Sequence, residues 1–479
     1  MLPQESIKME INVPVEMRDG TKLRADVYRP DDKDKHPAVL IRTPYNKAIT
    51  GNNDLLNIID TAHAGYAVII QDVRGRFASE GEWTRESMLT IEGYDGYDSV
   101  EWVGSQPWCD GSVGMAGASY MAGLQWIAAM ENPPSLKAIA PWMGGMGTMN
   151  RGMQPPPESG AISLSTAVAA IPQTCIELAD RFEREGRDVT DMRRTINRAL
   201  DNPEEFYNFL PLKDLPLARF DRIREMWNAR LRASVPKADQ ELHQRYDKII
   251  VPCLHVCGWY DILEHTSFES FKNLKERGGS PLAREGQHII VGPWPHGRLT
   301  NYLGDLNFGY SAGGLFAQIS AQNIAFFDKY LRGKEISIPP VRYFLMGKNR
   351  WRNSDSWPLP QTLWQRFYLH SNGSANTAEG DGLLNRDQPG SEPADMFLYN
   401  PHLPVPSIGG RIIGVGLVPG PLDQTHIEKR GDVLCYTTTE LVEDVEITGP
   451  LEIHIFAATS ARDTDFTAKV IDVYPDGRA

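Results

Sequence analysis

Short uncharged runs of apolar residues recur along the N-terminal part of the chain and predict the strands of a buried sheet. They occupy residues 37–41, 66–71, 113–116, 249–256 and 288–291. An uncharged apolar run is typical of a strand that is covered on both faces. Segments with helical spacing separate these runs. The pattern therefore predicts an α/β fold with a mostly parallel sheet, helices on both faces, and functional residues at the carboxyl ends of the strands.

Two segments at the N-terminus show strand-like patterning and a turn between them. Residues 7–17 and 22–28 are joined through Arg18-Asp19-Gly20. Two such strands with a short polar turn predict a β-hairpin, which we place at an edge of the sheet.

The stretch Gly117-Ala118-Ser119-Tyr120 lies between a predicted strand and a predicted helix over residues 120–130. Small residues around the serine allow the strand and the helix to approach closely at a sharp turn. This is the arrangement of a nucleophile elbow, which lifts a serine onto the start of a helix. The alternative is an ordinary glycine-rich turn whose serine caps the helix.

The literal pattern G-x-S-x-G occurs elsewhere, at residues 309–313. The residues before it are polar and contain no buried-strand run, so the context that gives the pattern its meaning is missing. We therefore reject Ser311 as a nucleophile.

An acid and a histidine follow two later predicted strands. Asp261 comes just after the run at 249–256, and His296 follows the run at 288–291. Serine, acid and histidine thus occur in the chain order of an α/β-hydrolase. Taken singly, Asp261 could cap a helix over residues 262–274 and His296 could be a surface loop residue. His255 and His288 are poorer candidates for the base, because they lie within or at the start of strands.

These residues suit acyl transfer. A serine hydroxyl needs a base, which His296 would supply, while Asp261 would fix the imidazole tautomer. The tetrahedral oxyanion needs hydrogen-bond donors. By position, the backbone N–H of Tyr120 is one, and the phenol of Tyr45, in the loop after the first buried run, is the other. Tyr45 could equally be a packing residue after Pro44.

Composition narrows the class of protein. The chain has 479 residues, which is ample for two or three domains, and a net charge of -13, which disfavours nucleic acid or an anionic membrane as the main partner. Its five cysteines are scattered; Cys253 and Cys257 are best explained as buried apolar thiols. We expect no metal and no cofactor. Without a recognisable signal or membrane-spanning segment, we expect a cytoplasmic enzyme.

The region between the two halves of the predicted sheet differs in character. Residues 175–232 are strongly charged and helical in pattern, with an apolar stripe of Ile176, Leu178, Phe182, Met192, Ile196 and Leu200. We interpret this region as a helical cap inserted over the catalytic face. Met146 and Met149 could line an adaptable acyl pocket, although methionine is more often core filler.

Several motifs together resemble one known family, the CocE/NonD hydrolases, which include cocaine esterase and X-Pro dipeptidyl-peptidases. They lie at residues 42–45, 71–81, 108–111, 117–120, 258–261 and 291–296. The resemblance implies that Ser119 is the nucleophile, Asp261 the acid, His296 the base and Tyr45 the oxyanion tyrosine. It also implies a C-terminal domain of jelly-roll type. We interpret the segment around Asp72 and Arg74 as a structural, ion-paired loop.

The chain departs from the family near the nucleophile. Ala122 stands where the family commonly has glycine. In the amino acid ester hydrolase branch a carboxylate at this place helps to hold the ammonium group of the substrate, so Ala122 disfavours that specificity. The cap sequence is too different for residues of the acyl pocket to be transferred.

Short strands separated by Gly, Pro, Asn and Asp are predicted after residue 351, a pattern typical of a β-sandwich. They span residues 362–369, 395–399, 432–438, 442–447 and 451–457. The sequence stops at a predicted hairpin turn, partway through the jelly roll that the resemblance implies. An incomplete sandwich would leave an open edge, so we expect a fragment or a poorly stable protein.

The predicted domains are an α/β-hydrolase domain over residues 1–145 and 246–348, a cap over 146–245, and an incomplete, galactose-binding-like jelly roll over 349–479. The predicted function is a serine hydrolase that cleaves carboxylic esters through an acyl-enzyme. An X-Pro dipeptidyl-peptidase is the nearest alternative, followed by an acylase or an idle binding protein. The expected partner is a small ester or a peptide-like substrate, and a homodimer stays open.

Overall fold

A computed structural model describes residues 6–50, 52–53, 55–83, 91–146, 175–231, 245–462 and 464–479. Its main feature is a sheet of ten strands in the order β1-β2-β6-β3-β7-β8-β9-β10-β13-β14. The pairs from β6 across to β13 are parallel, and the strands at both edges are antiparallel. The strands are β1 (Ile7–Glu16), β2 (Lys22–Pro30), β3 (His36–Thr43), β6 (Ala67–Asp72), β7 (Cys109–Ala118), β8 (Leu136–Trp142), β9 (Cys253–Tyr260), β10 (Gln287–Pro295), β13 (Val341–Leu345) and β14 (Arg350–Ser354).

The predicted strands form for the reason that their patterns indicate. In β3, Ala38 and Leu40 belong to one hydrophobic cluster, whereas Val39 and Ile41 belong to another. Successive side chains of a strand point to opposite faces, so an uninterrupted apolar run supplies both clusters at once. The N-terminal hairpin of β1 and β2 is also confirmed, and it lies at the edge of the sheet.

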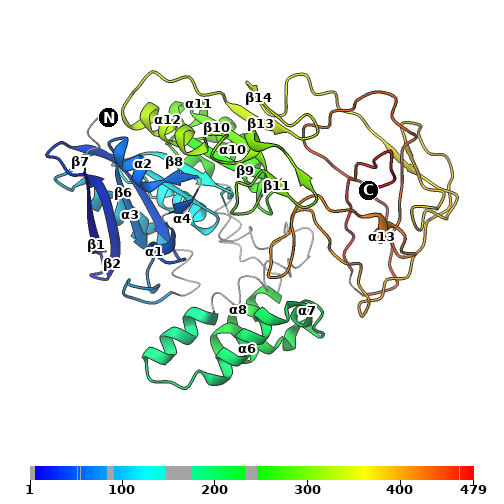
Figure 1. Ribbon diagram of the computed structural model, residues 1–479, viewed down its shortest axis with the longest axis horizontal. Coiled ribbons are helices and arrows are strands. Elements are labelled where there is room, and N and C mark those ends of the chain that lie inside the picture. Colours follow the sequence, from blue (N-terminus) through cyan, green and yellow to red (C-terminus); the bar gives the residue numbers. More distant parts are fainter. Residues whose placement is uncertain are drawn as a thin grey trace.

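Helices cover both faces of this sheet. On one face, α3 (Glu92–Gly104), α4 (Tyr120–Met130) and α10 (Glu264–Arg277) contribute Val100, Trp126 and Leu274 to a shared cluster. On the other, α2 (Ile58–His63) and α12 (Ile319–Leu331) contribute Ile58 and Phe326. The predicted α/β layers are therefore present, and Figure 1 shows the helices beside the strands.

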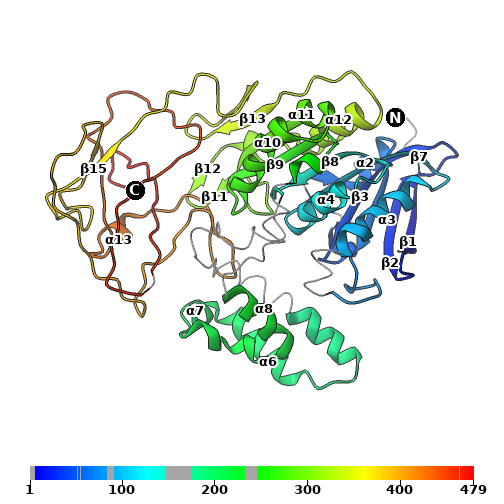
Figure 2. The ribbon, with the colours of Figure 1, turned by 180° about the vertical axis from the view of Figure 1, so that it is seen from behind.

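A separate group of helices lies at one end of the sheet, as both ribbon views show (Figures 1 and 2). It comprises helical residues 175–184, α6 (Thr190–Asp201), α7 (Pro203–Tyr207) and α8 (Asp221–Leu231). Most of the predicted apolar stripe packs together here, with Met192 and Ile196 buried. Ile176 is an exception, because it is 40% exposed. Residues 147–174 and 232–244, with Met149 and Met153, lie outside the described part.

Short elements connect these parts. They are α1 (Lys47–Thr50), β4 (Asn52–Asn53), β5 (Leu56–Asn57), α11 (Pro281–Glu285), β11 (Tyr302–Leu303), β12 (Leu306–Asn307), and the 3-10 turns η2 (Leu212–Asp214), η3 (Pro216–Arg219), η4 (Tyr246–Lys248) and η5 (Tyr310–Ala312). One strand was predicted to begin at residue 249. The turn η4 lies directly before this residue, and Pro252 has no N–H to donate to a ladder. Strand β9 therefore begins only at Cys253.

The strands predicted in the C-terminal region are mostly wrong. Its described residues contain only the pair β15 (Tyr368–His370) and β16 (Leu383–Asn385) and one helical turn, α13 (Thr425–Glu428). In the predicted strand at 432–438, Leu434 and Thr437 form isolated bridges with Asn376 and Leu383, and the predicted strands at 395–399, 442–447 and 451–457 have no bridge. Alternation identifies side chains suited to a half-buried strand, but a strand forms only when a neighbouring segment pairs with it. Here Val442 and Leu451 stay exposed instead.

Candidate active site

Ser119 lies at the sharp turn between β7 and α4. Its backbone has φ 60 and ψ -122, a conformation that is strained for any residue with a side chain. Gly117 precedes it with φ +143, and a Cβ there would lie 2.6 Å from the Cβ of Met121. The strand-turn-helix context that the sequence predicts for a nucleophile elbow is therefore present.

Backbone and side-chain bonds hold this turn in place. The N–H of Ser119 donates to the carbonyl of Trp142 at 3.0 Å, which ties the turn to the end of β8. Gln125, fully buried in α4, donates to the Gly117 carbonyl at 3.0 Å and accepts from the Ala140 N–H. Gln125 was not predicted from the sequence. A single polar residue in an otherwise apolar helix was the signal that could have revealed it.

Asp261 and His296 meet at the ends of β9 and β10. The Nδ1 of His296 lies 2.7 Å from the Oδ1 of Asp261, whose side chain is fully buried. The same Oδ1 accepts the N–H of Leu263 at 2.9 Å, just before α10. The alternative that Asp261 caps the helix is wrong, because the N-cap of α10 is Leu263 and no side chain caps it; Asp261 instead closes the turn just before the helix. Its second oxygen, Oδ2, has no hydrogen-bond partner among the residues that the structure describes.

Tyr45 follows β3, and its phenol reaches the elbow. Burial raises the pKa of Tyr45, and the nearby Ser119 side chain and Tyr120 backbone N–H oppose that rise. The Tyr45 phenol therefore lies close to both Ser119 and the Tyr120 N–H. A phenol O–H and a backbone N–H beside the serine are the two kinds of donor that an oxyanion hole requires.

Met143 links the serine side of the site to the histidine side. It follows Trp142 with φ 47, is fully buried, and its Sδ accepts the N–H of Gly297 at 2.9 Å. Among the described residues, no hydrogen bond joins the Nε2 of His296 to the Ser119 hydroxyl. Such catalytic bonds are often long before substrate binds.

Other candidates have structural roles. Ser311 lies in the turn η5, away from any strand-to-helix elbow. His255 is buried beside Gln287, and burial lowers its pKa to about 4. Met146 is core filler, because it is 4% exposed within a hydrophobic cluster. All five cysteines are free, and the described residues contain no group of His, Cys, Asp or Glu suited to a metal ion.

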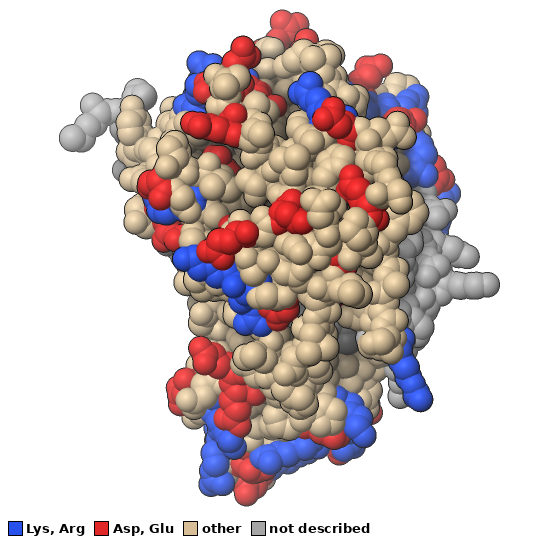
Figure 3. Space-filling model, turned by 90° about the vertical axis from the view of Figure 1, so that its right-hand side faces the viewer, with Lys and Arg blue, Asp and Glu red and all other residues tan. Residues whose placement is uncertain are grey.

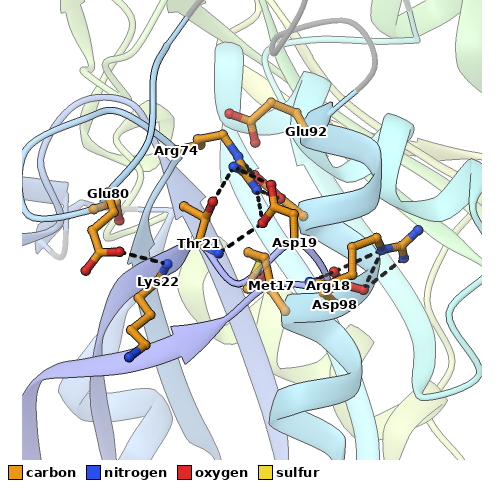
Figure 4. Close-up of polar contacts among 12 residues, drawn as sticks. Met17, Arg18, Asp19, Thr21, Lys22, Arg74, Glu80, Glu92 and Asp98 are labelled. Atoms are coloured by element: carbon orange, nitrogen blue, oxygen red, sulfur yellow. Dashed lines mark hydrogen bonds and ion pairs between the residues drawn. The ribbon is translucent and has the colours of Figure 1, made fainter.

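The segment around Asp72 and Arg74 braces the sheet, as predicted. Arg74 pairs with Asp95 at 2.7 Å and with Asp19 at 2.8 Å, and it also donates to Thr21, so it ties the first hairpin to α3 (Figure 4). Asp72 accepts backbone N–H groups, including that of Lys47 at 2.8 Å. None of these bonds joins Asp72 or Arg74 to the residues around Ser119.

Comparisons with known proteins agree with this arrangement. Residues 19–298 match the family described as X-Pro dipeptidyl-peptidase (S15 family), and residues 336–479 match the X-Pro dipeptidyl-peptidase C-terminal non-catalytic domain. The chain is 37% identical to cocaine esterase from Rhodococcus sp. (strain MB1 Bresler) over 98% of its own length and 81% of that protein.

Two solved structures support the fold. An α-amino acid ester hydrolase has a TM-score of 0.64 at 20% identity, over 93% of this chain and 75% of that one. A CocE/NonD family hydrolase from Staphylococcus aureus has a TM-score of 0.53 at 22% identity, over 80% and 61%. The predicted α/β-hydrolase fold with a C-terminal non-catalytic domain is confirmed. The chain belongs to the X-Pro dipeptidyl-peptidase S15 family and is a serine hydrolase similar to cocaine esterase and other CocE/NonD hydrolases.

Proposed function

We propose that the protein hydrolyses carboxylic acyl esters through an acyl-enzyme formed on Ser119. The observation that carries the proposal is the convergence of the Tyr45 phenol and the Tyr120 N–H beside a serine held at a strained elbow. The Asp261–His296 pair at the ends of two further strands supplies a base.

The same groups serve both halves of the proposed reaction. Ser119 Oγ attacks the acyl carbonyl while His296 Nε2 accepts its proton, and the Tyr45 O–H and Tyr120 N–H bind the resulting oxyanion. The C–O bond to the leaving group breaks as His296 returns the proton to the alcohol. Water then attacks the acyl-enzyme by the same route. Asp261 stabilises the imidazolium and fixes the Nδ1–H tautomer.

Ester cleavage is supported by the similarity to cocaine esterase over nearly the full chain. The position of Ala122 adds a limit on specificity. It is fully buried in α4 and offers no carboxylate to a substrate ammonium group. We therefore place small esters without an α-amino group first among the substrates.

X-Pro dipeptidyl-peptidase activity is the second candidate, and the match of both domains to that family favours it. The two activities share the acyl-enzyme but differ in the group that enters the acyl pocket. Release of p-nitroaniline from Ala-Pro-p-nitroanilide would show the peptidase, and hydrolysis restricted to p-nitrophenyl and benzoyl esters would show the esterase.

Fluorophosphonate labelling with peptide mass spectrometry tests the nucleophile. We expect stoichiometric labelling at Ser119, loss of labelling in Ser119→Ala, and slower labelling in His296→Ala. Ser311→Ala is the matched control, because it changes the serine of the literal G-x-S-x-G pattern and should label like the unaltered protein. Full labelling of Ser119→Ala at another serine would refute the assignment.

We also propose the setting in which this chemistry occurs. The free state of all five cysteines supports a reducing, cytoplasmic environment. Figure 3 shows acidic and basic side chains interspersed on the face it presents, which supports a small-molecule or peptide-like substrate over nucleic acid. No helix of the described residues is long and apolar enough to cross a membrane. We further propose that the domains end at residues 145, 245 and 348. We also propose that the protein forms a homodimer.

A further inference from the structure

We infer that Arg76 positions the oxyanion tyrosine: its guanidinium fixes the loop that carries Tyr45 and links this loop to the helical cap. The inference rests on the proposed function, because it assigns Tyr45 to the oxyanion hole. Arg76 belongs to the loop after β6, and no role near the elbow was predicted for it from the sequence. Its arginine neighbour at Arg74 serves the sheet instead.

Arg76 bonds to the backbone next to Tyr45. Arg76 is only 5% exposed, and its Nε donates to the carbonyl of Pro44 at 3.0 Å. Pro44 directly precedes Tyr45, so this bond restrains the peptide from which the phenol projects. The N–H of Tyr45 bonds to its own loop through Thr43 Oγ1 at 3.0 Å. Arg76 therefore restrains the residue before Tyr45 from outside the loop, in addition to Asp72, which accepts the Lys47 N–H.

The guanidinium of Arg76 also packs against aromatic rings. It lies 4.8 Å from the ring centre of Trp83 and 5.3 Å from that of Phe77. The indole N–H of Trp83 donates to the Tyr120 phenol at 3.2 Å. The Tyr120 ring in turn packs edge-to-face against Tyr45, with ring centres 6.4 Å apart. Arg76 thus holds both tyrosines, one through the backbone and one through Trp83.

The guanidinium of Arg76 also places a positive charge close to the two tyrosines. Burial lowers the pKa of Arg76 to about 10, and the nearby Tyr120 and Tyr45 phenols oppose this shift. A guanidinium stays protonated at neutral pH even so. A positive charge next to the donor phenol favours the negative charge that develops on the substrate oxygen.

Arg76 forms an ion pair with the carboxylate of Glu177, in the helical residues 175–184 of the cap. The same cap helix reaches the loop a second time, where Arg181 lies 3.7 Å from Glu82. By contrast, Arg74 pairs with Asp95 and Asp19 within the α/β unit. Arg76 therefore contacts both the cap, through Glu177, and the loop that carries Tyr45, through Pro44.

A double-mutant cycle tests this role. It compares the unaltered protein, Arg76→Lys, Tyr45→Phe and the double variant. Lysine keeps the charge near Glu177 but lacks the planar fork that donates to Pro44 while stacking on Trp83. The readouts are kcat and KM for p-nitrophenyl butyrate and the inhibition constant of a trifluoromethyl ketone, whose serine adduct carries an oxyanion. Arg74→Lys is the matched control for a buried arginine of the same loop.

We expect Tyr45→Phe to lower kcat by about a hundredfold. Arg76→Lys should lower kcat by about tenfold, leave KM within about threefold, and weaken the ketone by the same factor as kcat. In the double variant, the arginine change should add less than about twofold to the loss from Tyr45→Phe. Arg74→Lys should lower thermal stability but keep kcat within about twofold.

The opposite results would overturn the inference. Multiplicative losses in the double variant, or an unchanged kcat in Arg76→Lys, would show that Arg76 does not act through Tyr45. Glu177→Gln leaves the bond to Pro44 in place and should keep kcat within about threefold; a loss as large as that of Arg76→Lys would assign the effect to the ion pair alone. Full activity of Tyr45→Phe or Ser119→Ala would instead refute the proposed function.

Discussion

Asp261 Oδ1 accepts two hydrogen bonds at once, one from His296 Nδ1 at 2.7 Å and one from the Leu263 N–H at 2.9 Å. The backbone bond fixes the carboxylate, and the carboxylate fixes the ring. With its proton on Nδ1, the imidazole presents Nε2 as the base. The rest of the proposed mechanism depends on this tautomer.

Replacing this carboxylate by an amide should disable the base while leaving the fold intact. Asp261→Asn keeps an oxygen for the Leu263 N–H but removes the negative charge that stabilises the imidazolium and holds the Nδ1–H tautomer. We expect kcat for an ester to fall by about 10⁴-fold. Steady-state kinetics measures the loss, and circular dichroism checks the fold. A fall of less than tenfold would remove Asp261 from the proposed triad.

The elbow should tolerate no side chain at Gly117. Gly117→Ala would place a Cβ 2.6 Å from that of Met121 in a backbone with φ +143. We expect the rate of fluorophosphonate labelling at Ser119 to fall by more than about tenfold, because the turn must shift. Gly111→Ala is the control, since Gly111 also has positive φ but nothing lies within 4 Å of an added Cβ. It should cost about 1 kcal/mol of stability without slowing the labelling.

Met143 should influence the histidine through its sulfur. Met143→Leu keeps the apolar volume but removes the acceptor for the Gly297 N–H, next to His296. Gly297 is exposed, so water can take the place of the sulfur and the loss is that of one ordinary hydrogen bond, about 0.5–1.5 kcal/mol. We expect the loop to shift and kcat to fall several-fold. Met146→Leu is the matched control, because Met146 is equally buried but packs in the core. Equal kinetics for the two variants would contradict the prediction.

Two buried histidines should make stability fall in mild acid. Burial lowers the pKa of His255 and of His288 from 6.5 to about 4. Between these two values the unfolded chain binds protons that the folded protein does not, so the free energy of unfolding rises with pH over this range. Stability is therefore complete above about pH 6.5 and is lost as the pH falls towards about 4, by about 3 kcal/mol for each histidine.

Urea unfolding at pH 7 and pH 5 measures this effect. His288 is held by the carbonyl of Pro339 and the hydroxyl of Tyr330, and a glutamine can bond to both. His288→Gln should therefore remove about half of the pH dependence while the protein stays folded. An unchanged pH dependence in this variant would show that His288 is not one of the groups responsible.

The sequence by itself determined the layers of the catalytic unit. Apolar runs such as residues 37–41 must be covered on both faces, which requires helices on each side of a parallel sheet. It also determined where the candidate residues lie, because Tyr45, Ser119, Asp261 and His296 each follow a strand, and parallel strands end at one edge. Local pattern and chain order carry this information.

Only the tertiary structure decided which groups support those residues. The bonds of Met143 to Gly297 and of Arg76 to Pro44 join segments that are far apart in the sequence, so no local pattern indicates them. The C-terminal region shows the same limit. Alternation there identified side chains suited to strands, but pairing depends on a neighbour that a local pattern cannot specify, and most of those segments formed no ladder.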